Sequence, residues 1–205
     1  NKAGKLNLGG NALTMQGGFS FSAGETAGDG VISVTNSSLT ISTADPGPTN
    51  NAAIDVYGGG SIASSATSRR LWNNGAIRVL GGTFRQTSSA RNVSGTGVWH
   101  VAAGAVLRFE NADTGWALGY PPYTFGGDPS GGVFDNDGLV VSSNAMWSLG
   151  RSAAAQGTHT GSFEGYGFDF FGAYTFRSNS SVNVDGELSV YQAVFEPGSS
   201  LATSN

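Results

Sequence analysis

The sequence predicts an all-β fold, a single-stranded parallel β-helix whose successive coils of about 22 residues stack into a solenoid. The prediction comes from a recurring phrase: a small polar residue, a Gly or Ala, one variable residue, and an apolar-x-apolar strand core. It occurs at Asp29–Val34, Asn51–Val56, Asn74–Val79 and Thr96–Val101. The anchor positions 30, 52, 75 and 97 are 22, 23 and 22 residues apart, which is the length of one coil.

The phrase continues with looser spacing in the second half of the chain. Anchors at Gly138, Gly161 and Gly186 follow at intervals of 41, 23 and 25 residues, and the interval of 41 is interpreted as two coils of about 20. Residues 1–205 are therefore predicted to form one solenoid domain of roughly nine coils.

A second apolar column supports the solenoid. Nine residues after the anchors lie Leu39, Phe84, Val106, Trp147, Phe170 and Phe195, with Ile62 one place late. Three short apolar strands per repeat cannot close a core alone, so each coil must cover the next.

Strand-like sequence also runs close to both termini. Since an open solenoid end exposes strand edges, we expect a segment of a longer protein or end-to-end self-association. A strictly monomeric chain, fully protected in hydrogen exchange, would contradict this.

Composition favours flat sheets and excludes several classes of function. The chain has 33 Gly and only 12% charged residues, about half the usual share. The absence of Cys excludes disulfides and thiolate metal sites. A net charge of −4 without a basic stripe argues against a nucleic-acid partner. No apolar run approaches the roughly 20 residues of a membrane span, and no cofactor motif is present.

Two stretches depart from the repeat. Residues 112–135 contain Pro121 and Pro122 among aromatics and glycines, and two adjacent prolines exclude a central strand. This stretch is predicted to be a loop insertion. Residues 157–176 are dense in aromatics, which predicts a bulged rung or a loop, although Phe163 and Phe170 fall on inward columns and favour a place in the core.

The coil phrase, the Asn/Ser/Gly turns and the absence of Cys resemble the parallel β-helix passenger domains of bacterial autotransporters and filamentous-haemagglutinin-like adhesins. The resemblance implies a right-handed parallel β-helix, an extracellular or cell-surface location, and an adhesin, fibre or scaffold role. Pectin-lyase-like enzymes and phage tailspikes share this fold, so the fold alone does not select a function. We expect a non-enzymatic surface solenoid that contacts glycans or proteins. The alternative is a pectin-lyase-like carbohydrate-active enzyme or a tailspike-like glycan-processing protein.

The catalytic candidates lie on the outward column, between the two strand-core positions. This column reads Ser33, Asp55, Arg78, His100, Val141, Glu164 and Ser189. Asp55, Arg78 and His100 are expected on three consecutive rungs. By resemblance to polysaccharide lyases of this fold, Arg78 would be the base and the other two would support it. The favoured interpretation is an exposed ion-pair ladder worth about 0–1 kcal/mol.

The ligand-binding candidates lie on the predicted loop. They are Trp116, Tyr120, Tyr123, Phe125 and Asp128. Aromatic rings could stack on sugars or press against a partner protein. The alternative is that the loop folds back and buries its aromatics against the flank of the coil.

The polar column just before the anchors is predicted to be scaffold. It reads Asp29, Asn51, Asn74, Thr96, Asp137, Thr160 and Asp185. These side chains could bind cations or sugar hydroxyls, but bonds to turns and to neighbouring rungs explain them better. The segment Asp135–Gly138 lacks the ligands of a calcium loop, so no metal site is predicted.

Overall fold

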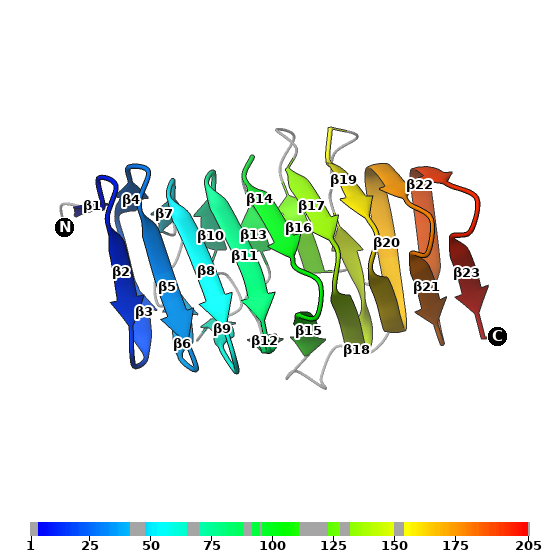
Figure 1. Cartoon of the computed structure of the whole chain (residues 1–205), viewed down its shortest axis with the longest axis horizontal. Helices are drawn as coiled ribbons and strands as arrows, with labels where there is room; N and C mark the ends of the chain where they lie inside the picture. The colour runs from blue at the N-terminus through cyan, green and yellow to red at the C-terminus, as the bar shows by residue number, and fades with distance from the viewer. Residues whose placement is uncertain are drawn as a thin grey trace.

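The computed structural model describes residues 4–41, 48–64, 70–87, 92–94, 96–110, 123–127, 132–149 and 154–204. Every regular element among them is a β-strand, and the strands coil around a long axis with the termini at opposite ends (Figure 1). Every strand pairing is parallel and joins one coil to the next. The predicted all-β solenoid is therefore confirmed. In this part of the chain, no helix is long and apolar enough to cross a membrane.

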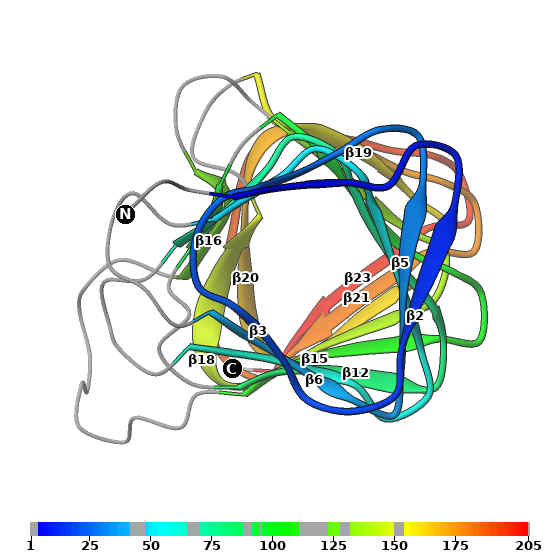
Figure 2. The same cartoon turned by 90° about the vertical axis from the view of Figure 1, so that its left-hand side faces the viewer.

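The coil has three sides, here called faces A, B and C (Figure 2). Face A contains β2 (Ala12–Met15), β5 (Val31–Thr35), β8 (Ala53–Tyr57), β11 (Ala76–Gly81), β14 (Val98–Val101), β17 (Val133–Asn136) and β19 (Gln156–His159). Face B contains β3 (Phe19–Phe21), β6 (Ser38–Ile41), β9 (Ser61–Ser64), β12 (Thr83–Thr87), β15 (Val106–Glu110), β21 (Ser181–Val184) and β23 (Ser200–Thr203). Face C contains β1 (Lys5–Asn7), β4 (Glu25–Ala27), β7 (Thr49–Asn50), β10 (Arg70–Asn73), β13 (Asn92–Ser94) and β16 (Tyr123–Gly127).

Three long strands continue around corners. These are β18 (Leu139–Leu149), β20 (Ser162–Phe176) and β22 (Leu188–Phe195). β18 passes from face B to face C, β20 passes through B, C and A, and β22 passes from C to A. Seen from the N-terminal end in Figure 2, the chain turns clockwise as it recedes from the viewer. The coil is therefore right-handed, the hand that parallel crossover connections favour.

The number of coils differs slightly from the prediction. Seven separate strands lie on face A, which gives about seven turns instead of roughly nine. Beyond β19, the ends of β20 and β22 add two further rungs to face A. These two rungs are parts of long strands that turn a corner, so they are not counted among the seven separate strands.

The predicted spacing of 22 is confirmed through Gly97, but the interpretation of the next interval is wrong. Val98 pairs with Val133, so this coil takes 35 residues. Gly97 precedes face A, whereas Gly138 precedes β18 on face B. The interval of 41 is therefore one long coil plus one passage along face A. All three corners accept the same Gly-plus-strand phrase, so the phrase does not identify its face.

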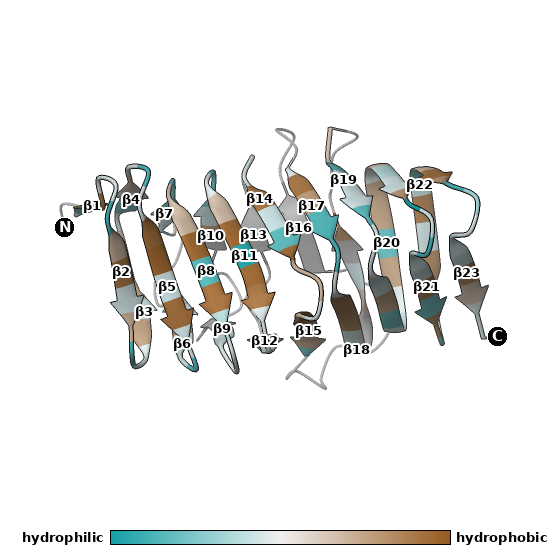
Figure 3. Cartoon of the chain, in the orientation of Figure 1, coloured by the Kyte–Doolittle hydropathy of each residue, from teal (hydrophilic) through white to brown (hydrophobic). Residues whose placement is uncertain are grey.

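Mostly apolar side chains stack on the inward positions of face A. One column stacks Leu13, Ile32, Ile54, Ile77, Trp99 and Phe134. The next stacks Met15, Val34, Val56, Val79, Val101, Asn136, His159, Phe176 and Phe195. The three isoleucines are at most 2% exposed, and each stabilises the coil by about 1.5–3 kcal/mol. Figure 3 shows these apolar bands crossing the face-A strands.

The second apolar column of the sequence lies on more than one face. Leu39 and Phe84 are buried on face B as predicted. Val106 is only half-buried because its neighbour Leu107 takes the inward place. Trp147 and Phe170 are buried on face C instead.

The anchor glycines sit where consecutive rungs approach closely. A Cβ on Gly75 would lie 2.0 Å from the carbonyl oxygen of Ala52, and a Cβ on Gly161 would lie 2.1 Å from that of Gly138. Real Cβ atoms do not approach this closely, so a side chain at either position would force the rungs apart. The recurring Gly is therefore explained by close backbone approach at the corner.

A row of buried polar side chains, here called the buried ladder, lies at the corner between faces C and A and consists of Thr26, Asn50 and Asn73. The Thr26 hydroxyl donates to Asn50 Oδ1 at 2.7 Å, and Asn50 Nδ2 donates to Asn73 Oδ1 at 2.7 Å. Asn50 Nδ2 also bonds the carbonyl of Ala52 at 2.9 Å. These side chains are almost fully buried, so the ladder satisfies polar groups that would otherwise be costly inside the coil.

Aromatic rings fill the C-terminal half of the coil around a buried histidine. Phe163, Phe168, Phe170 and Phe176 are at most 1% exposed. The His159 ring lies 4.8 Å from Phe163 and 5.0 Å from Phe176 between ring centroids, and it stacks on Tyr174 at 5.3 Å. Neither His159 nitrogen has a hydrogen-bond partner among the residues that the structure describes. Burial lowers the pKa of His159 to about 3, because the apolar surroundings disfavour the imidazolium.

Both predicted departures from the repeat contain regular strands. Within 112–135, the segment Tyr123–Gly127 is β16, paired with β13 and β18, and β17 begins at Val133. The remaining predicted insertion, residues 112–122 and 128–131, lies outside the described residues. The stretch 157–176 throws out no loop. It forms most of β19 and β20, with a register shift between Phe170 and Ala173, and the core placement of Phe163 and Phe170 is confirmed.

Apolar side chains are exposed on the last rung. Phe195 and Leu201 continue inward columns, and they are 38% and 51% exposed. Phe195 is covered on one side by the parallel ring of Phe176 at 4.6 Å. End-to-end association stays a prediction.

We predict that Asn50→Ala destabilises the coil by about 2 kcal/mol, because the buried Thr26 hydroxyl loses its acceptor and the buried Asn73 Oδ1 loses its donor. The exposed Asn74, which donates to Asn51 at 3.2 Å, provides the matched control. Asn74→Ala should change stability by no more than about 0.5 kcal/mol. Urea unfolding followed by circular dichroism measures both values, and equal losses would contradict a special role for the buried ladder.

We predict that acid destabilises the coil through His159. Its folded pKa, about 3, is below the unfolded value near 6.5, so the unfolded chain binds the extra proton first. The contribution is complete above about pH 6.5 and is lost as the pH falls toward 3, by up to about 1.4 kcal/mol per pH unit. Urea unfolding at several pH values measures this slope. His159→Phe should flatten it, whereas His100→Gln, which removes the other imidazole, should keep it. An unchanged slope in His159→Phe would refute the assignment.

Candidate functional site: the polar ladder of face A

The outward side of face A carries a row of polar side chains, here called the polar ladder: Ser33, Asp55, Arg78, His100 and Asp135. The strand pairing places these residues in register on consecutive rungs. They occupy one column because each lies between two inward core positions of its strand. In Figure 3 the ladder crosses β8, β11, β14 and β17 as a hydrophilic band.

The structure confirms the first four members of the predicted column and corrects the others. Val141 and Glu164 lie on face B, and Ser189 lies on face C. The place after His100 belongs to Asp135, which the sequence interpretation missed. The recurring phrase is present at Gly132-Val133-Phe134-Asp135-Asn136. It is not recognised there because the polar Asn136 occupies the second core position, where the repeat has an apolar residue.

Asp55 and Arg78 form a closed pair. Arg78 Nε donates to Asp55 Oδ1 at 2.6 Å, and Arg78 Nη2 donates to Asp55 Oδ2 at 2.9 Å. The Asp55 side chain is only 10% exposed, and that of Arg78 is 38% exposed. Such a two-pronged bond between planar charged groups is the strongest form of this interaction.

The pair decides the protonation of Arg78. Its hydrogen bonds to Asp55 raise the pKa of Arg78 above its ordinary value, and the attraction of the Asp55 charge adds to this, while desolvation acts in the opposite sense. A general base must lose its proton near the working pH. Arg78 therefore loses its proton less readily than a free arginine, so it is less available as a general base.

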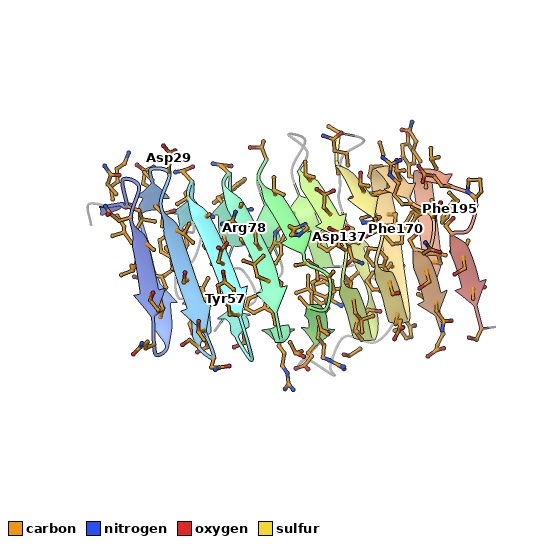
Figure 4. The ribbon with its side chains drawn as sticks, viewed as in Figure 1. Asp29, Tyr57, Arg78, Asp137, Phe170 and Phe195 are labelled. Carbon is orange, nitrogen blue, oxygen red and sulfur yellow. The ribbon has the colours of Figure 1, made fainter. Side chains whose placement is uncertain are left out.

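His100 is not part of a closed set. Its Nε2 lies 3.9 Å from Asp137 Oδ2, with both side chains partly exposed, which is beyond hydrogen-bond distance. Asp137 accepts the Thr160 hydroxyl at 2.6 Å, and Asp135 accepts the Thr158 amide at 2.8 Å. Figure 4 shows Arg78 on β11 and Asp137 just beyond β17. His100 is partly exposed and lies in register between Arg78 and Asp135. Each of these two neighbours already has another bonding partner.

The scaffold interpretation of the pre-anchor column is confirmed where its members are bonded. Asn74 donates to Asn51, and Thr160 donates to Asp137, in each case from one rung to the next. In the segment Asp135–Gly138, the Asn136 side chain accepts the Gly138 amide at 3.0 Å, as in an Asx turn. Within the described ranges, no group of three or more acidic or imidazole side chains is placed to hold a metal ion.

The predicted ligand-binding residues are only partly within the described chain. Trp116, Tyr120 and Asp128 lie outside it. The backbone of Tyr123 and Phe125 lies in β16 on face C, and their side chains are not described. Binding by these five residues stays a prediction.

Comparison with known proteins identifies no relative, because no protein-family model, curated protein or solved structure matches the chain.

We predict that Asp55 and Arg78 are coupled by about 1 kcal/mol in a double-mutant cycle of Asp55→Asn and Arg78→Gln. The bond is bidentate and Asp55 is mostly buried, so salt should weaken the coupling little. The matched control is the Lys5–Glu25 pair at 3.0 Å, whose side chains are 57% and 43% exposed. Its coupling should stay below about 0.5 kcal/mol. Urea unfolding gives the free energies, and a coupling no larger than that of the control would contradict the closed pair.

Proposed function

We propose that this chain is a non-enzymatic extracellular or cell-surface β-solenoid that acts as an adhesin, fibre or scaffold segment. Its partners are proposed to be glycans or proteins along its faces, and a second copy of the chain at its ends. The observation that carries the proposal is the state of the polar ladder. In this ladder, Arg78 makes a bidentate bond to Asp55, and Asp135 accepts a bond from the next rung. The neighbouring Asp137 also accepts a bond from the next rung.

The regular core also supports a structural role. The inward columns of face A continue from coil to coil, and the long strands continue the stack to the C-terminal rungs. Such a rod presents flat outer surfaces at fixed spacing, which suits contacts spread over several rungs. The β-helix is also the architecture of the passenger domains that the sequence resembles.

The enzymatic alternative requires Arg78 to act as a base. The raised pKa of Arg78 and its bond to Asp55 oppose that role. His100 would also need a partner, but its separation of 3.9 Å from Asp137 makes no hydrogen bond.

We predict binding without turnover. The experiment combines a glycan array with a lyase assay on uronide polymers, followed by the absorbance of unsaturated product. Trp116→Ala should reduce glycan binding, and Arg78→Ala should leave the background rate unchanged. Product formation that disappears in Arg78→Ala would overturn the proposal and establish the enzymatic alternative.

A further inference from the structure

Face B carries two arginines side by side on consecutive rungs. Arg85 on β12 pairs in register with Arg108 on β15. The neighbouring pair, Phe84 and Leu107, is buried in the core, so alternation along each strand places both arginines on the outer surface. Adjacent rungs are about 4.8 Å apart, which brings the two positive side chains into one small area.

Little negative charge balances this pair. Like charges directly opposite each other on neighbouring strands are destabilising. Glu110 Oε1 lies 3.8 Å from Arg85 Nε, with the Arg85 side chain 58% exposed. Arg108 makes no ion pair or hydrogen bond to any described residue. The contrast with Arg78, which has Asp55 in register, is direct.

The surroundings of the pair suit an extended, hydroxyl-rich ligand. Ser61 and Ser38 continue the column of Arg85 toward the N-terminal end, so hydroxyls follow the two guanidinium groups along the coil axis. Guanidinium forks recognise carboxylate and sulfate groups by paired hydrogen bonds. β12 and β15 are each paired on both sides, so a peptide cannot bind here by adding a strand.

We propose that Arg85 and Arg108 form a binding site for a carboxylate or sulfate group of an anionic polysaccharide that lies along face B. This inference rests on the proposed surface role and specifies its ligand class. The site uses side chains of an unbroken sheet, so binding needs no rearrangement of the coil. Since both guanidinium groups contact the anion, each contributes and affinity falls with salt.

The test measures the affinity of the whole chain for four probes by biolayer interferometry at low and physiological salt. The probes are a sulfated heparin hexasaccharide, an oligogalacturonate, a neutral oligosaccharide of equal length and a polyglutamate peptide. The sulfated or the uronate probe should bind, and Arg85→Gln with Arg108→Gln should weaken it by about tenfold or more. Arg177→Gln provides the matched control, because it removes one charge from the exposed Arg177–Glu196 pair; it should change affinity less than about twofold.

Each outcome decides the inference. Unchanged affinity for the anionic probes in the double variant, or no binding of them by the wild-type chain, overturns the site. Binding of the neutral probe with wild-type affinity in the double variant also overturns it, while leaving the proposed surface role intact. Equal binding of polyglutamate overturns the glycan assignment. Turnover in the lyase assay overturns the proposed function separately. The urea midpoint of each variant verifies folding, since both arginines are outside the core.

Discussion

The structure depends on the parallel, in-register pairing of each coil with the next. This pairing places every side chain about 4.8 Å above its equivalent in the preceding rung. Valine therefore stacks on valine from Val34 to Val101, and apolar area is buried along the axis as well as across it. The same pairing brings charges together. It joins Asp55 to Arg78 on face A and sets Arg85 beside Arg108 on face B.

The corners make the pairing possible. At Gly75 and Gly161 the backbones of consecutive rungs approach too closely for a side chain. At the corner between faces C and A, Thr26, Asn50 and Asn73 bond to one another inside the coil. A corner with the wrong residue would leave a buried polar group unpaired or separate the rungs. His159 shows the opposite case, because its ring nitrogens have no partner among the surrounding aromatics. It belongs to a column that is aliphatic from Met15 to Val101, and its lowered pKa is the reason that we expect acid to destabilise the C-terminal coils.

Charge compensation distinguishes the two polar surfaces. On face A the Arg78 guanidinium is closed by a mostly buried carboxylate, which fixes it in its protonated form and favours a structural role. On face B the positive charge of Arg108 has no counterpart among the described residues. An incoming anion would gain more from the open pair than from the closed one, since it displaces no existing ion pair. The proposed anion site is therefore on face B, and not at the catalytic candidates Asp55, Arg78 and His100 on face A.

The sequence by itself determined the all-β solenoid, the spacing near 22 and the neighbourhood of Asp55, Arg78 and His100, because the apolar alternation and the anchors are local patterns. Only the tertiary structure decided which face each later phrase occupies, since all three corners accept the same residues. It also brought Asp135 into the ladder and paired Arg85 with Arg108. The pairing aligns Val79 with Val101 and Thr83 with Val106. The first coil takes four residues between these two positions and the next coil takes five, so counting a fixed number of residues from each anchor does not align Arg85 with Arg108. The number of residues at a corner depends on packing between rungs, so a local sequence pattern does not predict it.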